Sequence, residues 1–328
     1  MSNYTHLTLV ERDVITTMLS EKKSMGEIAH ALGRSKGTIS RELARNSSSE
    51  YKLYLSHRAH GRAVHRKKQA SQRPRLKDDL IISYVTARLK EGWSPEQIAG
   101  RISIDYPDLS ISHEAIYQYI YHPATEGRQD LIQCLRRAHR KRKNKGIGRH
   151  ERKTKIPNRV SIDARPPAVD DREVFGHWEG DSLVSRKSLV ALNSLVERRS
   201  RLLFLTRLDR KTAKATFQTI VGRLQGLPPE ARMTLTLDNG TENAMHEEIT
   251  STIGISCFFA HPYASWERGT NEYINGLIRW YLPKGTDFCN ISNAQIACIE
   301  SLINNRPRKC LGFKTPLEVA SPIVALQG

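Results

Sequence analysis

The apolar residues of the first fifty positions recur with the spacing of short amphipathic helices. Between residues 8 and 20 they share one helical face, at Leu9, Val14, Ile15, Met18 and Leu19. Ser24 can cap a second helix that runs to residue 32, where Gly33 breaks it, and Ser35 can cap a third that runs to about residue 45. The pattern therefore predicts three short helices at the start of the chain.

The second and third of these helices have the spacing of a helix-turn-helix unit. Ala29, Gly33 and Ile39 supply a small residue for close packing, a turn glycine and a core aliphatic residue on the following helix. An ordinary three-helix bundle is the alternative. We predict a DNA-binding helix-turn-helix domain over residues 1–50. Its outward side chains are of the types that contact phosphates and base edges: Ser35, Lys36, Thr38, Ser40, Arg41 and Arg45.

A second helical unit is predicted over residues 77–125. A helix at 78–90 ends near Gly92, Ser94 caps the next helix, and a longer connection leads to a third helix at about 112–121. This order resembles a helix-turn-helix with a stretched turn. The third helix carries three candidate DNA contacts, His113, Tyr117 and Gln118.

Two basic stretches flank this unit and are expected to be linkers, over residues 51–76 and 126–165. Residues 58–77 contain eight Lys and Arg, and residues 136–155 contain eleven with a single acid, Glu151. Such a run fits a segment that follows a DNA backbone. A merely solvated linker is the alternative.

From about residue 173 the period of the apolar positions changes to that of strands. The expected order is three strands, a helix, a strand, a helix, a strand and two longer helices, or βββαβαβαα. This is the order of a ribonuclease-H-like domain, which we expect over residues 166–322. The sequence thus predicts a multidomain protein, with helical N-terminal modules and an α/β C-terminal domain.

The charge of the chain is strongly asymmetric. Its net charge is +18, and residues 1–165 carry 33 Lys and Arg against 17 Asp and Glu, a net +16. Residues 166–328 carry 19 against 17, a net +2. A positive field confined to one half of a chain indicates a polyanionic partner, with nucleic acid foremost.

The cysteines, the apolar runs and the N-terminus indicate in which compartment of the cell the protein is expected. The five cysteines are widely spaced and include no CxxC pair, so we expect reduced thiols rather than a zinc site. No apolar run reaches the ~18 residues that a membrane span needs. The N-terminus lacks a basic-then-apolar signal pattern. We expect a cytoplasmic protein.

Three acids fit a site for phosphodiester cleavage with two metal ions. Such a site needs carboxylates that hold two cations roughly 3.5–4 Å apart, and Mg²⁺ prefers oxygen ligands. Asp181 lies in the first predicted strand, and Asp238 ends the fourth, directly before Asn239 and Gly240. Glu272 lies in a predicted helix. These three residues are the candidate catalytic and metal-binding acids.

The helix that carries Glu272 has two distinguishable faces. Its apolar residues follow the spacing of a buried stripe, at Ile274, Leu277, Ile278 and Tyr281. Glu272, Asn275 and Arg279 share the spacing i, i+3, i+7 and are expected to point together at the site.

One acid competes with Asp181. Glu179 precedes it by two residues and therefore lies on the same face of the strand. It is either a supporting partner of the site or a substitute for Asp181, and the residues alone leave both open.

Four segments resemble the insertion-sequence-thirty family of bacterial transposases. They are HWEGD, LDNGTEN, HPYASWERGTNEYINGLIRWYLPKGTD and NNRPRKCLGFKTPLEV, and the N-terminal GRSKGTISRELARN is also similar to that family. The second aspartate and the glutamate of the family are separated by 33 residues, as are Asp238 and Glu272. Tyr273 stands where the family pattern has Asn. This departure bears on DNA contacts rather than on metal binding.

The resemblance implies a DNA transposase with an integrase-like core. Asp181, Asp238 and Glu272 would then hold two Mg²⁺ ions, or Mn²⁺, for strand cleavage and transfer. Arg279 and Lys284 would contact phosphates near the scissile bond, and Asn239 and Asn275 would orient water or DNA.

The expected partners are double-stranded DNA, namely the terminal inverted repeats of the element and a target, and further copies of the chain, as a dimer or larger assembly on nucleoid DNA. Two rival hypotheses are a catalytically inactive DNA-binding repressor and a ribonuclease-H-type nuclease that acts on RNA–DNA hybrids. Intact acids at all three positions argue against the first, and two DNA-binding helical modules argue against the second.

Overall fold

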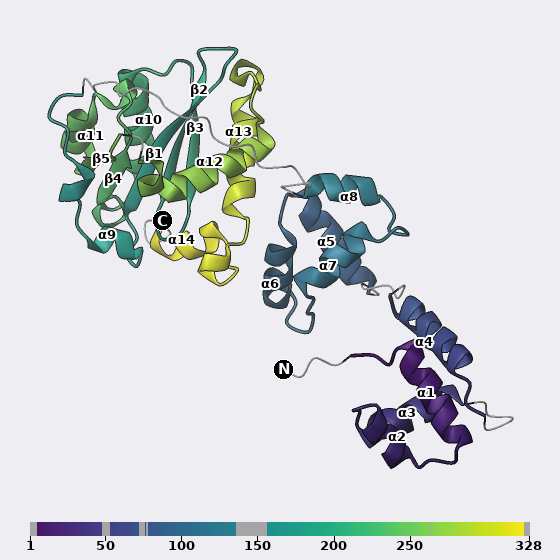
Figure 1. The fold of residues 1–328 in the computed structure, drawn as a ribbon. Coiled ribbons are helices and arrows are strands. Elements are labelled where there is room, and N and C mark those ends of the chain that lie inside the picture. Colours follow the sequence, from purple (N-terminus) through teal and green to yellow (C-terminus); the bar gives the residue numbers. More distant parts are fainter. Residues whose placement is uncertain are drawn as a thin grey trace. The chain divides into compact units, whose positions relative to one another are not determined.

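A computed structural model describes residues 5–47, 53–71, 76, 78–135, 156–262 and 264–324. The chain divides into two compact units, Met1–Arg75 and Leu76–Gly328. Each is treated by itself below, with the elements labelled as in Figure 1.

The first unit begins with the three expected helices. They are α1 (Leu9–Ser20), α2 (Met25–Ala31) and α3 (Lys36–Asn46). Each starts at a hydroxyl side chain that accepts a hydrogen bond from a backbone N–H of the first turn, at Thr8, Ser24 and Ser35. One aliphatic residue from each helix is fully buried in a shared core, at Ile15, Ile28 and Ile39.

A fourth helix, α4 (Ser56–Ser71), occupies most of the stretch expected to be the first basic linker. The linker interpretation therefore needs correction for these residues. Ala59 is fully buried, and Tyr54, just before the helix, donates a hydrogen bond to Glu42 of α3 at 3.0 Å. The helix was not predicted because its sequence is rich in Lys and Arg and has few apolar positions, since it packs through one narrow stripe.

The second unit starts with a four-helix bundle. Its helices are α5 (Asp79–Lys90), α6 (Pro95–Asp105), α7 (His113–Tyr121) and α8 (Arg128–Cys134). The bundle includes the three expected helices and extends past residue 125, because Leu131 of α8 is buried in the same core as Ile98 and Ile116. Half of the second predicted linker, residues 136–155, lies outside the described residues.

A five-stranded mixed sheet forms the centre of the remaining residues (Figure 1). Its strand order is β3-β2-β1-β4-β5, with β1, β2 and β3 antiparallel and β1, β4 and β5 parallel. This topology confirms the ribonuclease-H-like α/β fold expected from the order of elements. The strands are β1 (His177–Val184), β2 (Ala191–Glu197), β3 (Leu203–Leu208), β4 (Thr234–Leu237) and β5 (Ser256–Phe259).

Alternate residues of β1 contribute to the two cores on opposite faces of the sheet. Trp178 belongs to the core beneath α10 (Ala213–Leu224) and α11 (His246–Ile253). Leu183 belongs to the core beneath α12 (Gly269–Tyr281) and α13 (Asn293–Asn304). Asp181 and Glu179 have the parity of Leu183, which places them on the face that α12 covers.

Short elements complete the second unit. The remaining α-helices are α9 (Ala168–Asp171) and α14 (Pro316–Val324). Single 3₁₀ turns lie at Ile162–Ala164, Pro229–Ala231, Thr241–Asn243, Ser265–Arg268, Phe288–Asn290 and Lys309–Leu311. Among the described residues, no helix has the length and apolarity to cross a membrane.

Helix α6 packs directly against the chain that follows α13. A Cβ on Gly100 would lie 2.4 Å from the ring of Phe313, so only glycine permits this approach. Gln97 is buried and donates to the carbonyl oxygen of Pro307 at 2.6 Å, while its own side-chain oxygen accepts from Arg306 at 2.9 Å. The bundle and the sheet domain are therefore joined by an interface that includes a close backbone approach and two hydrogen bonds of Gln97.

Candidate active site

Two of the three candidate acids lie together at one edge of the sheet. Asp181 is in the second half of β1, and Asp238 directly follows β4. These two strands are parallel neighbours, so their carboxyl ends meet at the same edge. The side chain of Asp181 is 24% exposed and that of Asp238 33% exposed, which leaves both accessible to a ligand.

A guanidinium group lies between the two aspartates. Arg268 Nη1 is 3.5 Å from Asp181 Oδ1, and Nη2 is 3.9 Å from Asp238 Oδ2. Nη1 also donates to the carbonyl oxygen of Gly180 at 3.1 Å. The positive charge reduces the repulsion between the carboxylates. No pattern in the sequence distinguishes Arg268, although it lies four residues before Glu272.

The electrostatics at Asp181 reflect this crowding. Burial raises the pKa of its carboxyl group above the ordinary value, Arg268 acts in the opposite direction, and Asp238 adds to the rise. A partly buried carboxyl next to a second one favours an added cation, because a cation restores the charged form that burial opposes.

Asn275 contacts Asp181, as its place on the helix predicted. Its Nδ2 donates to Asp181 Oδ2 at 2.6 Å, and its Oδ1 accepts from Ser194 of β2 at 3.2 Å. The backbone N–H of Ser182 donates to the other oxygen of Asp181 at 2.9 Å. The orientation of the Asp181 carboxylate is thus fixed by neighbours on two strands and one helix.

The third candidate acid, Glu272, lies in the first turn of α12, where its side chain is exposed. Among the residues that the structure describes, no three acidic, His or Cys side chains gather closely enough to hold a metal ion. The apolar face of α12 is as expected, since Ile274, Leu277 and Ile278 are fully buried. Of the three residues expected to point together at the site, Asn275 contacts Asp181, and the convergence of Glu272 and Arg279 on the same point stays a prediction.

Glu179 has a role of its own, because both of its oxygens are engaged inside the protein. The residue is fully buried, accepts from the backbone N–H of Asn271 at 2.9 Å and accepts from Arg198 at 3.0 Å. Asn271 in turn donates its side-chain amide to the carbonyl oxygen of Glu179 at 3.2 Å. This pairing fastens the first turn of α12 to β1. It makes Glu179 a positioning residue and does not favour it as a substitute for Asp181.

The surroundings of Asp238 are also built from amides. Asn243 donates to Asp238 Oδ1 at 2.8 Å, and the backbone N–H of Gly240 donates to the same oxygen at 3.2 Å. Asn239 turns toward the end of β5, where it donates to the carbonyl oxygen of Ala260 at 2.7 Å, and it also accepts from Arg159. Asn239 therefore ties two strand ends together.

The two basic candidates of this region differ in exposure. Arg279 is half-buried, donates to the carbonyl oxygen of Val184 at 3.0 Å and places its guanidinium 5.3 Å from the centre of the Phe288 ring. Burial, and after it Arg186, lowers the pKa of Arg279. Lys284 is exposed beyond the end of the helix. Both remain candidates for phosphate contact.

The candidate DNA contacts of α3 form an open face. Lys36, Ser40, Arg41 and Arg45 are exposed, whereas Ile39 is fully buried on the opposite side. Ser35 and Thr38 serve the helix start, since the Ser35 hydroxyl accepts from the Thr38 backbone N–H at 3.2 Å. Gly33 has the positive φ, 60°, that the predicted turn requires.

In the second unit, the three candidate contacts of α7 are exposed as well. Tyr117 is 36% exposed, and Gln118 donates to Glu114 of the same helix at 3.1 Å. His113 begins the helix, directly after its cap Ser112. This face is polar and aromatic rather than basic.

The donor set at the sheet edge fits divalent metal ions of the Mg²⁺ type. Asp181 and Asp238 offer hard carboxylate oxygens, the ligands such ions prefer. The position between them holds a positive group, the Arg268 guanidinium. The two carboxylates therefore attract a cation at this point, and a bound metal ion would take over that role from Arg268.

Comparisons with known proteins add near-full-length relatives. A family model described as a helix-turn-helix domain matches residues 3–46. The transposase for insertion sequence element IS1086 of Cupriavidus metallidurans is 38% identical, over 99% of this chain and 96% of the relative. The transposase InsI for insertion sequence element IS30A of Escherichia coli is 40% identical, over 98% of this chain and 85% of the relative.

Two further matches complete this comparison. The transposase for insertion sequence element IS4351 of Bacteroides fragilis is 38% identical, over 97% of this chain and 96% of the relative. Among solved structures, the catalytic core domain of BIV integrase matches 44% of this chain and 91% of its own, with 22% identity and a TM-score of 0.36. The coverage by the three transposases extends across both compact units.

Proposed function

Since this chain belongs to the IS30 family of transposases, we propose that it binds the terminal inverted repeats of an insertion sequence and cleaves and joins DNA with Asp181, Asp238 and Glu272. The helix-turn-helix domain binds DNA, and α3 presents Lys36, Arg41 and Arg45 to the repeat. The observation that carries the catalytic part is the pair of aspartates, held at adjacent parallel strand ends around one positive group.

The proposed reaction has two phosphoryl-transfer steps. Water hydrolyses a phosphodiester bond at the element end and leaves a 3′-OH. That 3′-OH then attacks a phosphodiester of the target strand in line, which forms a new bond and releases a target 3′-OH. Two bound divalent ions would activate the attacking oxygen and stabilise the leaving oxygen.

Within this mechanism the residues of the chain have separate tasks. Asp181 and Asp238 hold the ions, and Asn275 keeps the Asp181 carboxylate oriented. Glu179 holds the first turn of α12. Glu272, in the first turn of α12, would complete the metal site.

Joining two element ends to one target calls for at least two protomers on DNA. We expect a dimer or a larger assembly, and the metal ions to be Mg²⁺ or Mn²⁺.

Asp238→Asn tests the catalytic assignment. The substitution keeps the shape of the side chain and its contact with Asn243 but removes a charge. We expect Mg²⁺-dependent cleavage of end-bearing DNA to fall by roughly a hundredfold to a thousandfold or more, the order found when one group that stabilises developing charge is lost. Binding of the same DNA should be unchanged.

Asp209→Asn is the matched control, because that aspartate is 94% exposed and lies beyond β3. Full cleavage by Asp238→Asn would exclude the assignment. A wild-type protein that binds ends but neither cleaves nor joins them with Mg²⁺ would instead support the repressor hypothesis. Preference for an RNA–DNA hybrid would support the nuclease hypothesis.

A further inference from the structure

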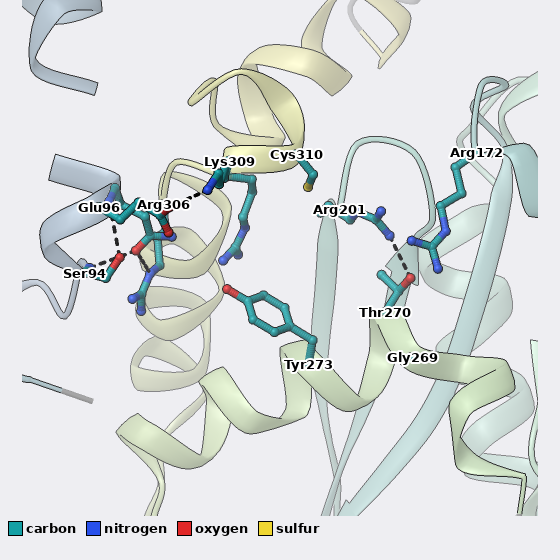
Figure 2. Close-up of a pocket in the computed structure, with 12 residues that line it drawn as sticks. Ser94, Glu96, Arg172, Arg201, Gly269, Thr270, Tyr273, Arg306, Lys309 and Cys310 are labelled. Carbon is teal, nitrogen blue, oxygen red and sulfur yellow. Dashed lines mark hydrogen bonds and ion pairs between the residues drawn. The ribbon is translucent and has the colours of Figure 1, made fainter. Parts of the chain in front are cut away.

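A basic pocket lies beside the first turns of α12, away from the aspartate pair. Its volume is about 560 Å³, and its walls come from the start of α6, the start of α12 and the residues just before Gly312 (Figure 2). Five of its lining side chains are cationic: Arg172, Arg201, Arg306, Arg308 and Lys309. Glu96 is the only acid among the lining residues.

The positive charge of this pocket exceeds what its own acid can balance. Glu96 accepts an ion pair from Lys309 at 2.6 Å. Arg201 is bonded to a neutral partner, the hydroxyl of Thr270, at 2.7 Å. Within the part of the chain that the structure describes, Arg172 has neither a hydrogen bond nor an ion pair from its side chain. Burial, followed by the charges of Arg201 and Arg198, lowers the pKa of Arg172. Like charges held this close favour a bound anion.

An aromatic ring lies among these cations. Tyr273 is 46% exposed, and the guanidinium of Arg308 is 5.7 Å from its ring centre. Figure 2 shows the ring between Lys309 on one side and the pair of Arg201 and Thr270 on the other. A rigid exposed ring next to cations is the arrangement on which nucleic acid bases stack, while the cations bind the adjacent phosphates.

We propose that this pocket binds one unpaired nucleotide of a DNA strand, with its phosphates at Arg172, Arg201 and Lys309 and its base on Tyr273. The volume falls in the range of about 300–1,000 Å³ that suits ligands of this size. Tyr273 and Thr270 line the pocket from the same two turns of α12 that carry Glu272, although Glu272 itself is not among the lining residues. The proposal rests on the proposed function, since it assigns the pocket to the DNA that is cut or joined.

The pocket also connects DNA binding to the start of α12. Arg201 holds Thr270 in the first turn, and Glu96 is carried by α6 of the helical bundle. A phosphate that contacts Arg201 is therefore connected through Thr270 to the first turn of α12, which carries Glu272. Occupation of the pocket and completion of the carboxylate site are expected to be linked for this reason.

Photocrosslinking of the full chain tests the pocket directly. The probe is a duplex with a short single-stranded extension that contains 5-bromodeoxyuridine, irradiated in the presence of EDTA so that no cleavage is required. We expect a crosslink to Tyr273, within the tryptic peptide of residues 269–279. Arg172→Glu should lower the crosslink yield about tenfold, since a charge-assisted hydrogen bond contributes about 1.5 kcal/mol or more. Lys309→Gln should lower it several-fold.

Lys214→Glu is the matched control. It makes the same change in charge at an exposed position of α10, on the opposite face of the sheet, and should leave the crosslink unchanged. A second measurement is the salt dependence of affinity for the extended DNA. Arg172→Glu should reduce the magnitude of the slope by about 0.7, the value for one phosphate of a single strand.

Equal crosslinking and equal salt slopes in the wild type and Arg172→Glu would overturn the proposal. So would a site that binds thymidine monophosphate in an Arg172-dependent manner but gives no DNA crosslink, because it would then serve free nucleotides. Asp238→Asn should retain the crosslink. If the crosslink fails but cleavage still depends on Asp238, the pocket proposal is excluded and the catalytic assignment stands. If the crosslink forms but Asp238→Asn cleaves fully, the catalytic assignment is excluded and the pocket proposal stands.

Discussion

The two helix-turn-helix-like modules of this chain share a sequence pattern but differ in what their outer surfaces contact. Each places a capping serine before a helix, Ser24 before α2 and Ser94 before α6, and each has a capping box. In the first module α3 exposes a basic face to solvent. In the second, α6 uses its outer surface to pack against the sheet domain through Gln97 and Gly100.

This difference shows that the pattern of buried positions fixes the local fold but not the partner of the outer face. In α3 the outward residues are long and charged, and a polyanion is their natural ligand. In α6, the counterpart of α2, Gly100 allows the backbone to approach Phe313 closely. In α7, the counterpart of α3, Tyr117 and Gln118 are exposed.

The largest expected effect concerns DNA binding by the first module. The double variant Arg41→Glu, Arg45→Glu should lower the affinity for end-bearing DNA about a hundredfold, because two charge-assisted contacts are lost. The magnitude of the salt slope should fall by about 2. Fluorescence anisotropy at several salt concentrations measures both.

The corresponding change in α7 gives the comparison. His113→Glu, Gln118→Glu should weaken binding much less, since this face carries no Lys or Arg. Equal losses from both modules would show that they contribute equally to DNA binding and would remove the contrast. Circular dichroism of each variant confirms that the helices are retained.

A smaller effect is expected on stability, where a Gly→Ala substitution should act in opposite directions in the packed helix α6 and in helix α4 of the first unit. Gly100→Ala places a methyl group against Phe313 and should destabilise the second unit by about 1–3 kcal/mol. Gly61→Ala, in α4, meets no atom within 4 Å and should stabilise its helix by about 0.5–1 kcal/mol.

The two units can be followed separately during urea unfolding. All four tryptophans lie after residue 76, so their fluorescence reports the second unit, whereas circular dichroism reports both. Gly100→Ala should shift the fluorescence transition to lower urea. An unchanged transition would mean that α6 does not need its close contact with the sheet domain.

The sequence was sufficient for features that depend on local periodicity. The buried stripe of α12 and the order of strands and helices along the chain followed from the spacing of apolar residues. The meeting of Asp181 and Asp238 followed from the placement of both acids on strands, because parallel neighbours end at the same edge.

Features that depend on distant packing were missed. Arg268 and Asp181 are 87 positions apart, and Glu179 and Asn271 are 92 apart, so no local pattern links either pair. The basic pocket gathers residues from five separate segments for the same reason. Helix α4 was missed because Ala59 is its one buried residue among the positions whose burial is described, which leaves almost no apolar period to detect.

The smallest expected effect is a pH dependence of the stability of the second unit. It comes from an ion pair between α6 and α14, at the interface of the bundle with the sheet domain. Arg101 of α6 donates two hydrogen bonds of 2.7 Å to Glu318 of α14. The hydrogen bond from Arg101 lowers the pKa of Glu318 from 4.5 to about 2. A carboxyl whose folded pKa is depressed stabilises the fold above its unfolded pKa, and that contribution is lost as the pH falls from about 4.5 through about 2.

Glu318→Gln should therefore destabilise the second unit at pH 7, and the difference from the wild type should shrink toward zero near pH 2. Because the side chain is 43% exposed, we expect the difference at pH 7 to be at most about 1 kcal/mol. Urea unfolding followed by tryptophan fluorescence measures the free energy of unfolding of both proteins. The other groups that titrate in acid affect both proteins equally, so their contribution drops out of the difference. Glu230→Gln, at an exposed turn, is the control. A difference that stays constant from pH 7 to pH 2 would mean that the charge of Glu318 does not support the interface, and that packing around Gly100 and Gln97 alone distinguishes α6 from the open module.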